Sequence, residues 1–298
     1  MPGTSELIRA RRRQSLRRNL TAYAFLAPAL AMFVLFLAWP VVMLFIQSFQ
    51  TGGVMGPAKF VGLANWRQIF SDDLVRQTIF NTLFYAAMAI PAVFIIAMVL
   101  ALCLNAIRIG QTPIKTILYF PTLQPILIAA LMFTFVLHQD FGILNILMRA
   151  ITGEPVNFLG NASLAMPTIA MVEVWKGAGF WTMLFLAGIQ GLPRDLFHAA
   201  ELDGAGPLRR FFELTLPLLK PTFFFSVVFA TIVNLQVFDS VFVLTDGGPA
   251  NATATTAWYI YRSLFSFNEP GYGATLSFIL VLVVLALTIV QSFWFREK

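Results

Sequence analysis

The stretch "HAAELDGAGPLRRFFELTLPLLKP", residues 198–221, is charged and helix-forming, although strongly apolar segments lie on both sides of it. Asp195 precedes it and favours the start of a helix, because a negative side chain interacts well with the N-terminal end of the helix dipole. Gly204 interrupts the helical pattern, and Gly206-Pro207 then opens a second helix. The stretch therefore predicts a helix–turn–helix elbow.

The rest of the chain is apolar. Of its 298 residues, 58% are hydrophobic and only 11% are charged, whereas an average soluble domain carries about 25% charged residues. The single cysteine, Cys103, excludes an intramolecular disulfide and a cysteine-based metal cage. The net charge of +6 owes much to six arginines in the first 18 residues, which fits membrane topology better than nucleic-acid binding.

Six segments offer the ~20 apolar residues that a helix needs to cross a bilayer core. They are 20–48, 78–106, 115–138, 165–190, 221–244 and 271–295. The first is too long and lacks a clear cleavage site for a signal peptide. The predicted fold class is therefore all-α, a polytopic membrane protein of six transmembrane helices over residues 20–298. A basic arm, 1–19, precedes them, and the elbow occupies 191–221.

The basic residues predict the orientation. If the N-terminus is cytoplasmic, the inner segments hold fourteen Lys and Arg residues and the outer segments hold five. The excess remains eight against five without the N-terminal cluster, as the positive-inside rule requires. Both termini and the elbow are therefore expected in the cytoplasm. In the outer loop, residues 56–73 mix apolar and charged side chains and favour an amphipathic helix at the outer interface.

The elbow resembles the EAA loop of binding-protein-dependent ABC importer permeases. That motif consists of EAA, three residues, Gly, about nine residues, then an apolar residue and Leu-Pro. The matching residues here are Ala199, Ala200, Asp203, Gly204, Ala205, Phe211, Leu216, Pro217 and Pro221. The alternative is an ordinary solvated loop, but such a loop needs neither paired alanines nor a glycine hinge.

Further segments resemble the carbohydrate branch of the same family. They are "FVGLANWRQIF" in the outer loop, "VWKGAGFWTMLFLAGIQGLP" at 174–193 and "VFDSVFVLTDGGP" at 237–249. The last is typical of the first of two paired permeases, the type related to the maltose-transporter large subunit and to the first glycerol-phosphate permease. The resemblance covers nearly all of residues 20–298.

The resemblance implies a permease subunit of an ATP-driven importer in a bacterial or archaeal cytoplasmic membrane, and not an enzyme. With a second permease it forms the path for a sugar that an extracytoplasmic binding protein delivers, by alternating access. Two ATPase subunits bind ATP-Mg, and this chain needs no cofactor and no metal. The coupling residues that the resemblance implies are His198, Ala199, Ala200, Glu201, Asp203, Gly204, Ala205 and Pro217.

One residue departs from the family pattern, because His198 stands where the motif has Glu. A neutral imidazole cannot form the ion pair that a carboxylate forms with a basic residue of the ATPase. Two alternatives stay open: His198 donates a hydrogen bond instead, or Asp195 or Glu201 supplies the charge.

The cargo path should combine hydrogen-bonding groups with aromatic faces. The candidates in or beside the predicted spans are Asn234, Gln236, Asp239, Ser240, Gln124, Tyr85, Glu173, Trp175 and Lys176. Gln124 lies between two prolines, where a broken helix would free backbone groups. Each candidate also has a structural alternative, and Glu173 and Lys176 at i,i+3 can form an ion pair on one helix face.

Two other classes of protein fit less well. A membrane enzyme needs convergent catalytic groups, but the two histidines are predicted on opposite sides of the membrane. An ion-coupled secondary transporter typically has an inverted repeat, and none is visible. The absence of a Walker A motif excludes the ATPase itself. For the cargo, a neutral saccharide is favoured over a glycerol phosphate, because Lys176 is the only basic residue in the interior of a span and has Glu173 as a ready partner.

Overall fold

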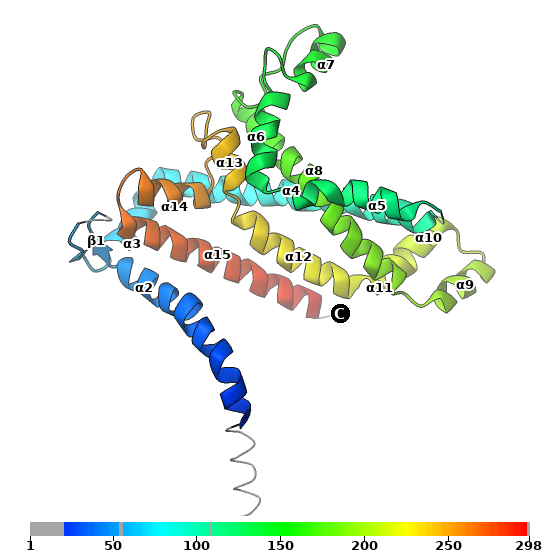
Figure 1. The fold of residues 1–298 in the computed structure, drawn as a ribbon, viewed down its shortest axis with the longest axis horizontal. Coiled ribbons are helices and arrows are strands. Elements are labelled where there is room, and N and C mark those ends of the chain that lie inside the picture. The colour runs from blue at the N-terminus through cyan, green and yellow to red at the C-terminus, as the bar shows by residue number, and fades with distance from the viewer. Residues whose placement is uncertain (1–20, 54–55, 108, 297–298) are drawn as a thin grey trace, which may run out of the picture.

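The computed structural model describes residues 21–53, 56–107 and 109–296. The predicted basic arm, 1–19, lies outside them. The described chain is a bundle of long helices in which α4 (Asp73–Ala106), α8 (Ala162–Gln190), α12 (Lys220–Leu235) and α15 (Pro270–Arg296) lie side by side (Figure 1). The all-α prediction is confirmed, since the strands in the described residues are the two-residue pair β1 (Gln50–Thr51) and β2 (Lys59–Phe60).

Four described helices are long and apolar enough to cross a membrane, and the number is six if each of two bent pairs is one span. The four are Thr21–Gln47, which includes η1 (Val34–Ala38) and α2 (Trp39–Gln47), then α4, α8 and Pro270–Trp294 of α15. They occupy the first, second, fourth and sixth predicted spans. The membrane-protein class is therefore confirmed. The two bent pairs overlap the third and fifth predicted spans.

The third predicted span, 115–138, is not one straight helix. Helix α5 (Gln111–Tyr119) continues into the 3₁₀ turn η2 (Phe120–Leu123), and α6 (Ile126–Val136) follows after a bend of 94°. The bend lies at Gln124, whose backbone is extended between Pro121 and Pro125. Proline lacks the amide hydrogen that a helix interior needs and pushes the preceding residue out of the helical region, which explains the break.

The fifth predicted span, 221–244, overlaps the second bent pair, in which Pro207–Leu218 and Lys220–Leu235 meet at a bend of 67°. This predicted span is also divided after Leu235. Helix α12 ends at Leu235, and three residues separate it from α13 (Asp239–Leu244). Neither Gly nor Pro lies at this break. Instead, the hydroxyl of buried Thr255 donates a hydrogen bond of 2.9 Å to the Val237 carbonyl, so a residue remote in sequence satisfies the backbone that has left the helix.

Two apolar clusters fill the bundle. One cluster includes Tyr85, Ile169, Val241 and Trp258, and the other joins α4, α8 and α12. Small residues let the helices approach closely, as is common in membrane bundles. Gly179 of α8 is the clearest case, because a Cβ built there would lie 2.1 Å from the Leu118 carbonyl oxygen of α5.

The segment 56–73 is helical only from Ala64 to Ser71 (α3). Before it, β2 pairs antiparallel with β1, so the prediction of one amphipathic helix through the whole segment is wrong. The amide of Asn65 holds the two parts together by donating hydrogen bonds of 2.9 Å to the Ser48 and Gln50 carbonyls. This contact pairs residues at least 15 positions apart, and a local pattern cannot reveal it.

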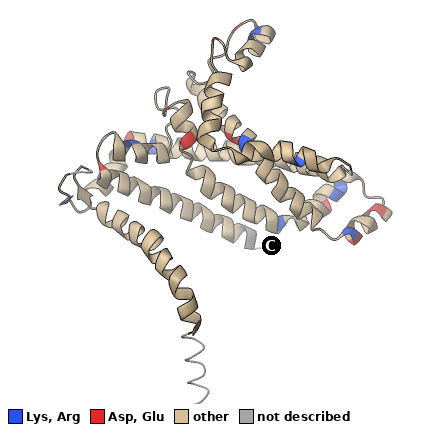
Figure 2. Cartoon of the chain, in the orientation of Figure 1, with Lys and Arg blue, Asp and Glu red and all other residues tan. Residues whose placement is uncertain are grey.

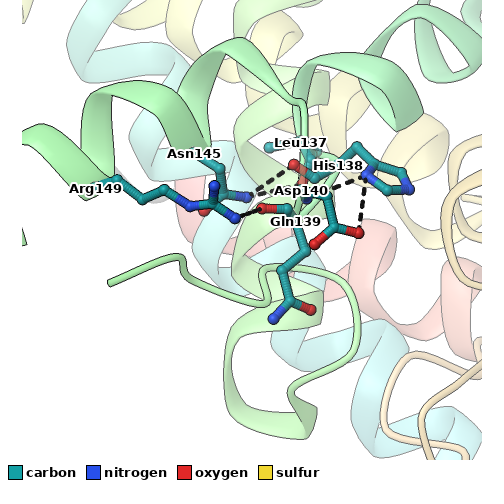
Figure 3. A network of polar contacts seen from close by, with 6 residues as sticks. All are labelled: Leu137, His138, Gln139, Asp140, Asn145 and Arg149. Carbon is teal, nitrogen blue, oxygen red and sulfur yellow. Dashed lines mark hydrogen bonds and ion pairs between the residues drawn. The ribbon is translucent and has the colours of Figure 1, made fainter. Parts of the chain in front are cut away.

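Helix α7 (Ile143–Thr152) stands clear of the bundle at the end of α6 (Figure 1). The fully buried Asn145 fixes it by donating to the Leu137 and His138 carbonyls (Figure 3). Its side-chain oxygen also accepts a hydrogen bond of 2.7 Å from the Val156 amide. Arg149 adds a hydrogen bond to the Gln139 carbonyl. The lobe is therefore held by polar contacts, while apolar side chains of α7 such as Ile143 and Ile151 are exposed.

Candidate functional site

The predicted elbow is present as two helical arms. Arm one is α9 (Arg194–Leu202), and its N-cap residue is Pro193. Arm two is α10 (Pro207–Arg210), which continues through the π-helical turn η3 (Phe211–Thr215) into α11 (Leu216–Leu218). The elbow lies at the end of the bundle away from β1, α3 and α14 (Thr256–Phe265) (Figure 1).

The turn between the arms depends on Gly204, whose φ is +76°. This is the left-handed region that glycine adopts without steric cost. The Gly204 amide donates to the Glu201 carbonyl at 3.1 Å, and the Ala205 amide donates to the Ala200 carbonyl at 2.9 Å. These bonds close the C-terminus of α9, as in helices that end on a left-handed glycine.

The predicted coupling residues are mostly on the surface. His198, Ala199, Glu201, Asp203, Gly204 and Pro217 are exposed, and Ala200 and Ala205 are half-buried. Leu202 and Leu208, which the prediction omitted, are among the most exposed large apolar side chains. Exposed apolar residues beside small ones are typical of a docking surface. Both leucines lie within the quoted elbow sequence, 198–221. Only the structure shows that neither side chain packs into the bundle.

Two ion pairs lie in the elbow. Arg210 of α10 lies 3.5 Å from Glu201 of α9, and thus spans the turn. Arg209 lies 2.9 Å from Glu213 within arm two. Because its carboxylate is paired inside the chain, Glu201 is not a free substitute for the glutamate that His198 replaces.

A cavity of about 330 Å³ lies between α4, η2, α8 and α12. Its polar lining comes from Thr122, Glu173, Lys176 and Asn234, and its aromatic lining from Phe180, Trp181 and Phe229. The volume is at the small end of the range for ligand pockets, about 300–1,000 Å³. Hydrogen-bonding groups and aromatic faces therefore meet here, as a saccharide site requires.

Much of the cavity's polar lining remains available to a ligand. The side-chain amide group of Asn234 donates to the Ala230 carbonyl of its own helix at 2.8 Å. The side-chain oxygen of Asn234 can therefore accept a hydrogen bond from a ligand. Thr122 donates to the Lys176 carbonyl at 2.9 Å and so attaches the broken α5–α6 pair to α8. The ion pairs within 4.0 Å in the described residues do not include Glu173 with Lys176. The predicted pairing of these two side chains is therefore absent here.

The structure brings only three of the predicted cargo residues into this cavity, namely Glu173, Lys176 and Asn234. Gln236 instead lines a groove of about 620 Å³ between α12, α14 and α15. Because α12 ends at Leu235, the residues on either side of that end face different parts of the molecule.

The other predicted cargo residues lie outside the cavity lining. Tyr85 and Ser240 are buried, and Trp175 packs against Phe133 of α6 with ring centroids 5.2 Å apart. Asp239 opens α13, and Gln124 has a buried side-chain oxygen without a hydrogen-bond partner in the described residues. The aromatic members of the cavity were missed, although Phe180 and Trp181 lie in the recognised segment 174–193.

The bundle, its cavity and the exposed elbow define the class of a membrane-embedded transport subunit. In the described residues, no group of three or more His, Cys, Asp or Glu side chains is placed to hold a metal ion. The family described as "Binding-protein-dependent transport system inner membrane component" matches residues 75–296, and the chain belongs to it. Members of this family are membrane components of ABC transporters, so the chain is a transport subunit and not an enzyme.

Curated relatives span nearly the whole chain. The sulfoquinovosyl glycerol permease SmoG of Agrobacterium fabrum is 34% identical over 284 residues, which cover 94% of this chain and 92% of that protein. The lactose permease LacF of Rhizobium radiobacter is 32% identical, covering 96% and 98%. The sn-glycerol-3-phosphate permease UgpA of Yersinia pestis is 33% identical, covering 93% and 94%.

Solved structures share the fold. A chain of a bacterial ABC transporter that imports the acidic polysaccharide alginate matches with a TM-score of 0.84 and 24% identity, covering 96% of this chain and 99% of that one. A second alginate transporter structure, in complex with a periplasmic protein bound to an alginate pentasaccharide, matches with a TM-score of 0.82. Both matches show that this chain shares its fold with those ABC transporter chains.

Proposed function

We propose that this chain, together with a second permease, forms the translocation path for a saccharide delivered by an extracytoplasmic binding protein. Two ATPase subunits would drive the alternating access of that path through the elbow. The observation that carries the proposal is the cavity, which is lined by three aromatic rings together with Glu173, Lys176 and Asn234. Aromatic faces suit the C–H surfaces of a sugar ring, and the polar heads suit its hydroxyl groups.

The charges of the cavity favour a neutral saccharide. One carboxylate and one ammonium group balance formally, so an anion gains the attraction of Lys176 but meets the repulsion of Glu173. A carboxylate also accepts hydrogen bonds from hydroxyl groups well. The runner-up cargo is a glycerol phosphate-type solute, which the lack of a close Glu173–Lys176 ion pair supports, because the ammonium group stays available.

Two features support the second permease. The helix Thr21–Gln47 has an apolar window of which 0% is buried against the rest of the chain. The groove that Gln236 lines between α12, α14 and α15 is also predominantly apolar. Surfaces of this kind offer room for neighbouring helices as well as for lipid. The "TDGGP" segment, 245–249, assigns this chain to the first position of the pair by its resemblance.

Two alanine variants test the path. First, the binding protein of the same transport system is titrated with a panel of neutral saccharides and with sn-glycerol 3-phosphate to identify the cargo. Uptake of that cargo is then measured in cells carrying Asn234→Ala or Gln236→Ala. We expect Asn234→Ala to lower the uptake kcat/KM about fivefold, as the loss of ~1 kcal/mol of hydrogen bonding predicts, and Gln236→Ala to stay near wild type. Equal effects of the two variants would place the path elsewhere.

A further inference from the structure

We infer that the Glu201–Arg210 ion pair positions the two arms of the elbow. It holds them at the angle that the elbow needs in order to dock on the ATPase. The inference rests on the proposed coupling function of the elbow. It assigns the pair a role inside this chain, and neither residue needs to touch ATP.

The ion pair is placed to control the angle because the turn itself contributes little packing. A Cβ built at Gly204 would meet no atom within 4 Å, so no side chain wedges the turn. The backbone amides of Gly204 and Ala205 donate their hydrogen bonds to carbonyls of α9, and the Arg210 amide donates to the Gly206 carbonyl at the start of arm two. None of these bonds joins the two arms. In the described residues, the Glu201–Arg210 contact of 3.5 Å is thus the ion pair that joins one arm to the other.

The environment of the pair makes it more effective in the complex than in the free chain. The Arg210 side chain is 26% exposed and that of Glu201 is 65% exposed, so water still screens the pair. Exposed pairs of this kind contribute little to stability. An ATPase cleft that covers the elbow would remove water and lower the local dielectric constant, and the same two charges would then attract more strongly.

The chain contains a matched control pair. Arg209 and Glu213 lie 2.9 Å apart, and their side chains are 66% and 60% exposed. They are four residues apart on arm two and do not span the turn. Neutralising either pair changes the surface charge equally, but only the Glu201–Arg210 pair links the arms.

The test uses the complete complex of this chain, its second permease and its ATPase subunits. ATP hydrolysis is measured in nanodiscs with and without the binding protein loaded with the sugar identified above, and retained ATPase is measured in detergent. We expect Glu201→Gln and Arg210→Gln to reduce the stimulation by the loaded binding protein about fivefold, which corresponds to ~1 kcal/mol. Arg209→Gln and Glu213→Gln should behave as wild type. The exchanged pair, Glu201→Arg with Arg210→Glu, should restore stimulation to within about twofold.

Two results would overturn the inference. One is an exchanged pair that fails to rescue, because Glu201 or Arg210 would then act on the ATPase directly. The other is Glu213→Gln being as damaging as Glu201→Gln, because surface charge alone would then explain the effect. The variant Gly204→Val tests the coupling function of the elbow independently of the ion pair. A β-branched residue is strongly disfavoured at φ +76°, so this variant should disturb the turn itself. Wild-type stimulation in Gly204→Val would contradict elbow coupling itself, and the inference with it.

Discussion

At the scale of single residues, Asp72 joins three helices through one carboxylate. Its Oδ2 atom accepts hydrogen bonds from the hydroxyls of Tyr259 in α14, at 2.6 Å, and Tyr272 in α15, at 2.5 Å. Its Oδ1 atom accepts from the Leu74 amide and caps α4. Partial burial raises the pKa of the Asp72 carboxyl, but the hydrogen bonds from Tyr259, Tyr272 and the backbone outweigh it and leave the pKa below its usual value.

Asp72→Asn should therefore lower the free energy of unfolding by roughly 1–3 kcal/mol at neutral pH, because the tyrosines lose a charged acceptor. The folded-state pKa is lower than the unfolded one, so this stability is fully present above the ordinary pKa of 3.8 and is lost as the pH falls through the folded value. In thermal melts of the purified protein, the melting temperatures of wild type and variant should differ by a constant amount at pH 5–8. This difference should become smaller below pH ~4.

The neighbouring Asp73 supplies the control for this measurement. Its side chain is 89% exposed and pairs with Arg76, also on the surface. Asp73→Asn should change the melt by little, since exposed ion pairs typically contribute ~1 kcal/mol or less. A difference for Asp72→Asn that persists unchanged at pH ~2 would show that the charge of the carboxylate is not what stabilises the junction.

At the scale of elements, the backbone of α5 crosses α8 directly over Gly179. Gly179 has no room for a methyl group, because its Cβ would lie 2.1 Å from the Leu118 carbonyl oxygen and 2.9 Å from the Tyr119 Cα atom. Both of these atoms belong to backbone, which cannot rotate away. The same crossing brings Thr122 to the Lys176 carbonyl and so carries the broken helix to the cavity.

Gly179→Ala should consequently destabilise the protein by about 1–3 kcal/mol, as overpacking typically does. Gly177→Ala, two residues earlier on the same helix, meets its nearest side-chain atom at 3.7 Å, an ordinary contact. The helical preference of alanine should make that variant neutral or more stable by up to ~1 kcal/mol. Melting temperatures in detergent compare the two, and equal destabilisation of both variants would disprove the close crossing.

At the scale of the whole molecule, the distribution of charge is the organising feature. Figure 2 shows few charged side chains along the described helices of the bundle, while Lys, Arg, Asp and Glu recur on the elbow. Charges inside a bilayer are costly, so they collect where the chain leaves it. The positive-inside count then predicts the elbow in the cytoplasm and the α7 lobe outside.

Reporter fusions can test that orientation. A reporter that is active only outside the membrane should work when it is fused after Glu154, beside α7, and should fail when it is fused after Asp203 in the elbow. A reporter that is active only in the cytoplasm should give the reverse pattern. Cytoplasmic signal at Glu154 would invert the topology and would separate the elbow from any ATPase.

The sequence alone was sufficient for the class of protein and for the elbow. Long apolar runs must become helices in a bilayer, because no other single-segment structure satisfies its backbone groups there. The turn could likewise be predicted from Gly204, because the ability of glycine to adopt positive φ is a local property. The resemblance of the elbow and the later segments to ABC importer permeases then led to the family to which the chain belongs.

Only the tertiary structure decided which polar residues share a cavity. Asn234 and Gln236 are two residues apart, yet they line different spaces, because α12 ends at Leu235. Thr122 reaches the same cavity as Asn234 because the helix breaks at Gln124 and because α5 crosses α8 at Gly179, both far from α12 in the sequence. Such placements arise from packing between distant segments, which local periodicity does not encode.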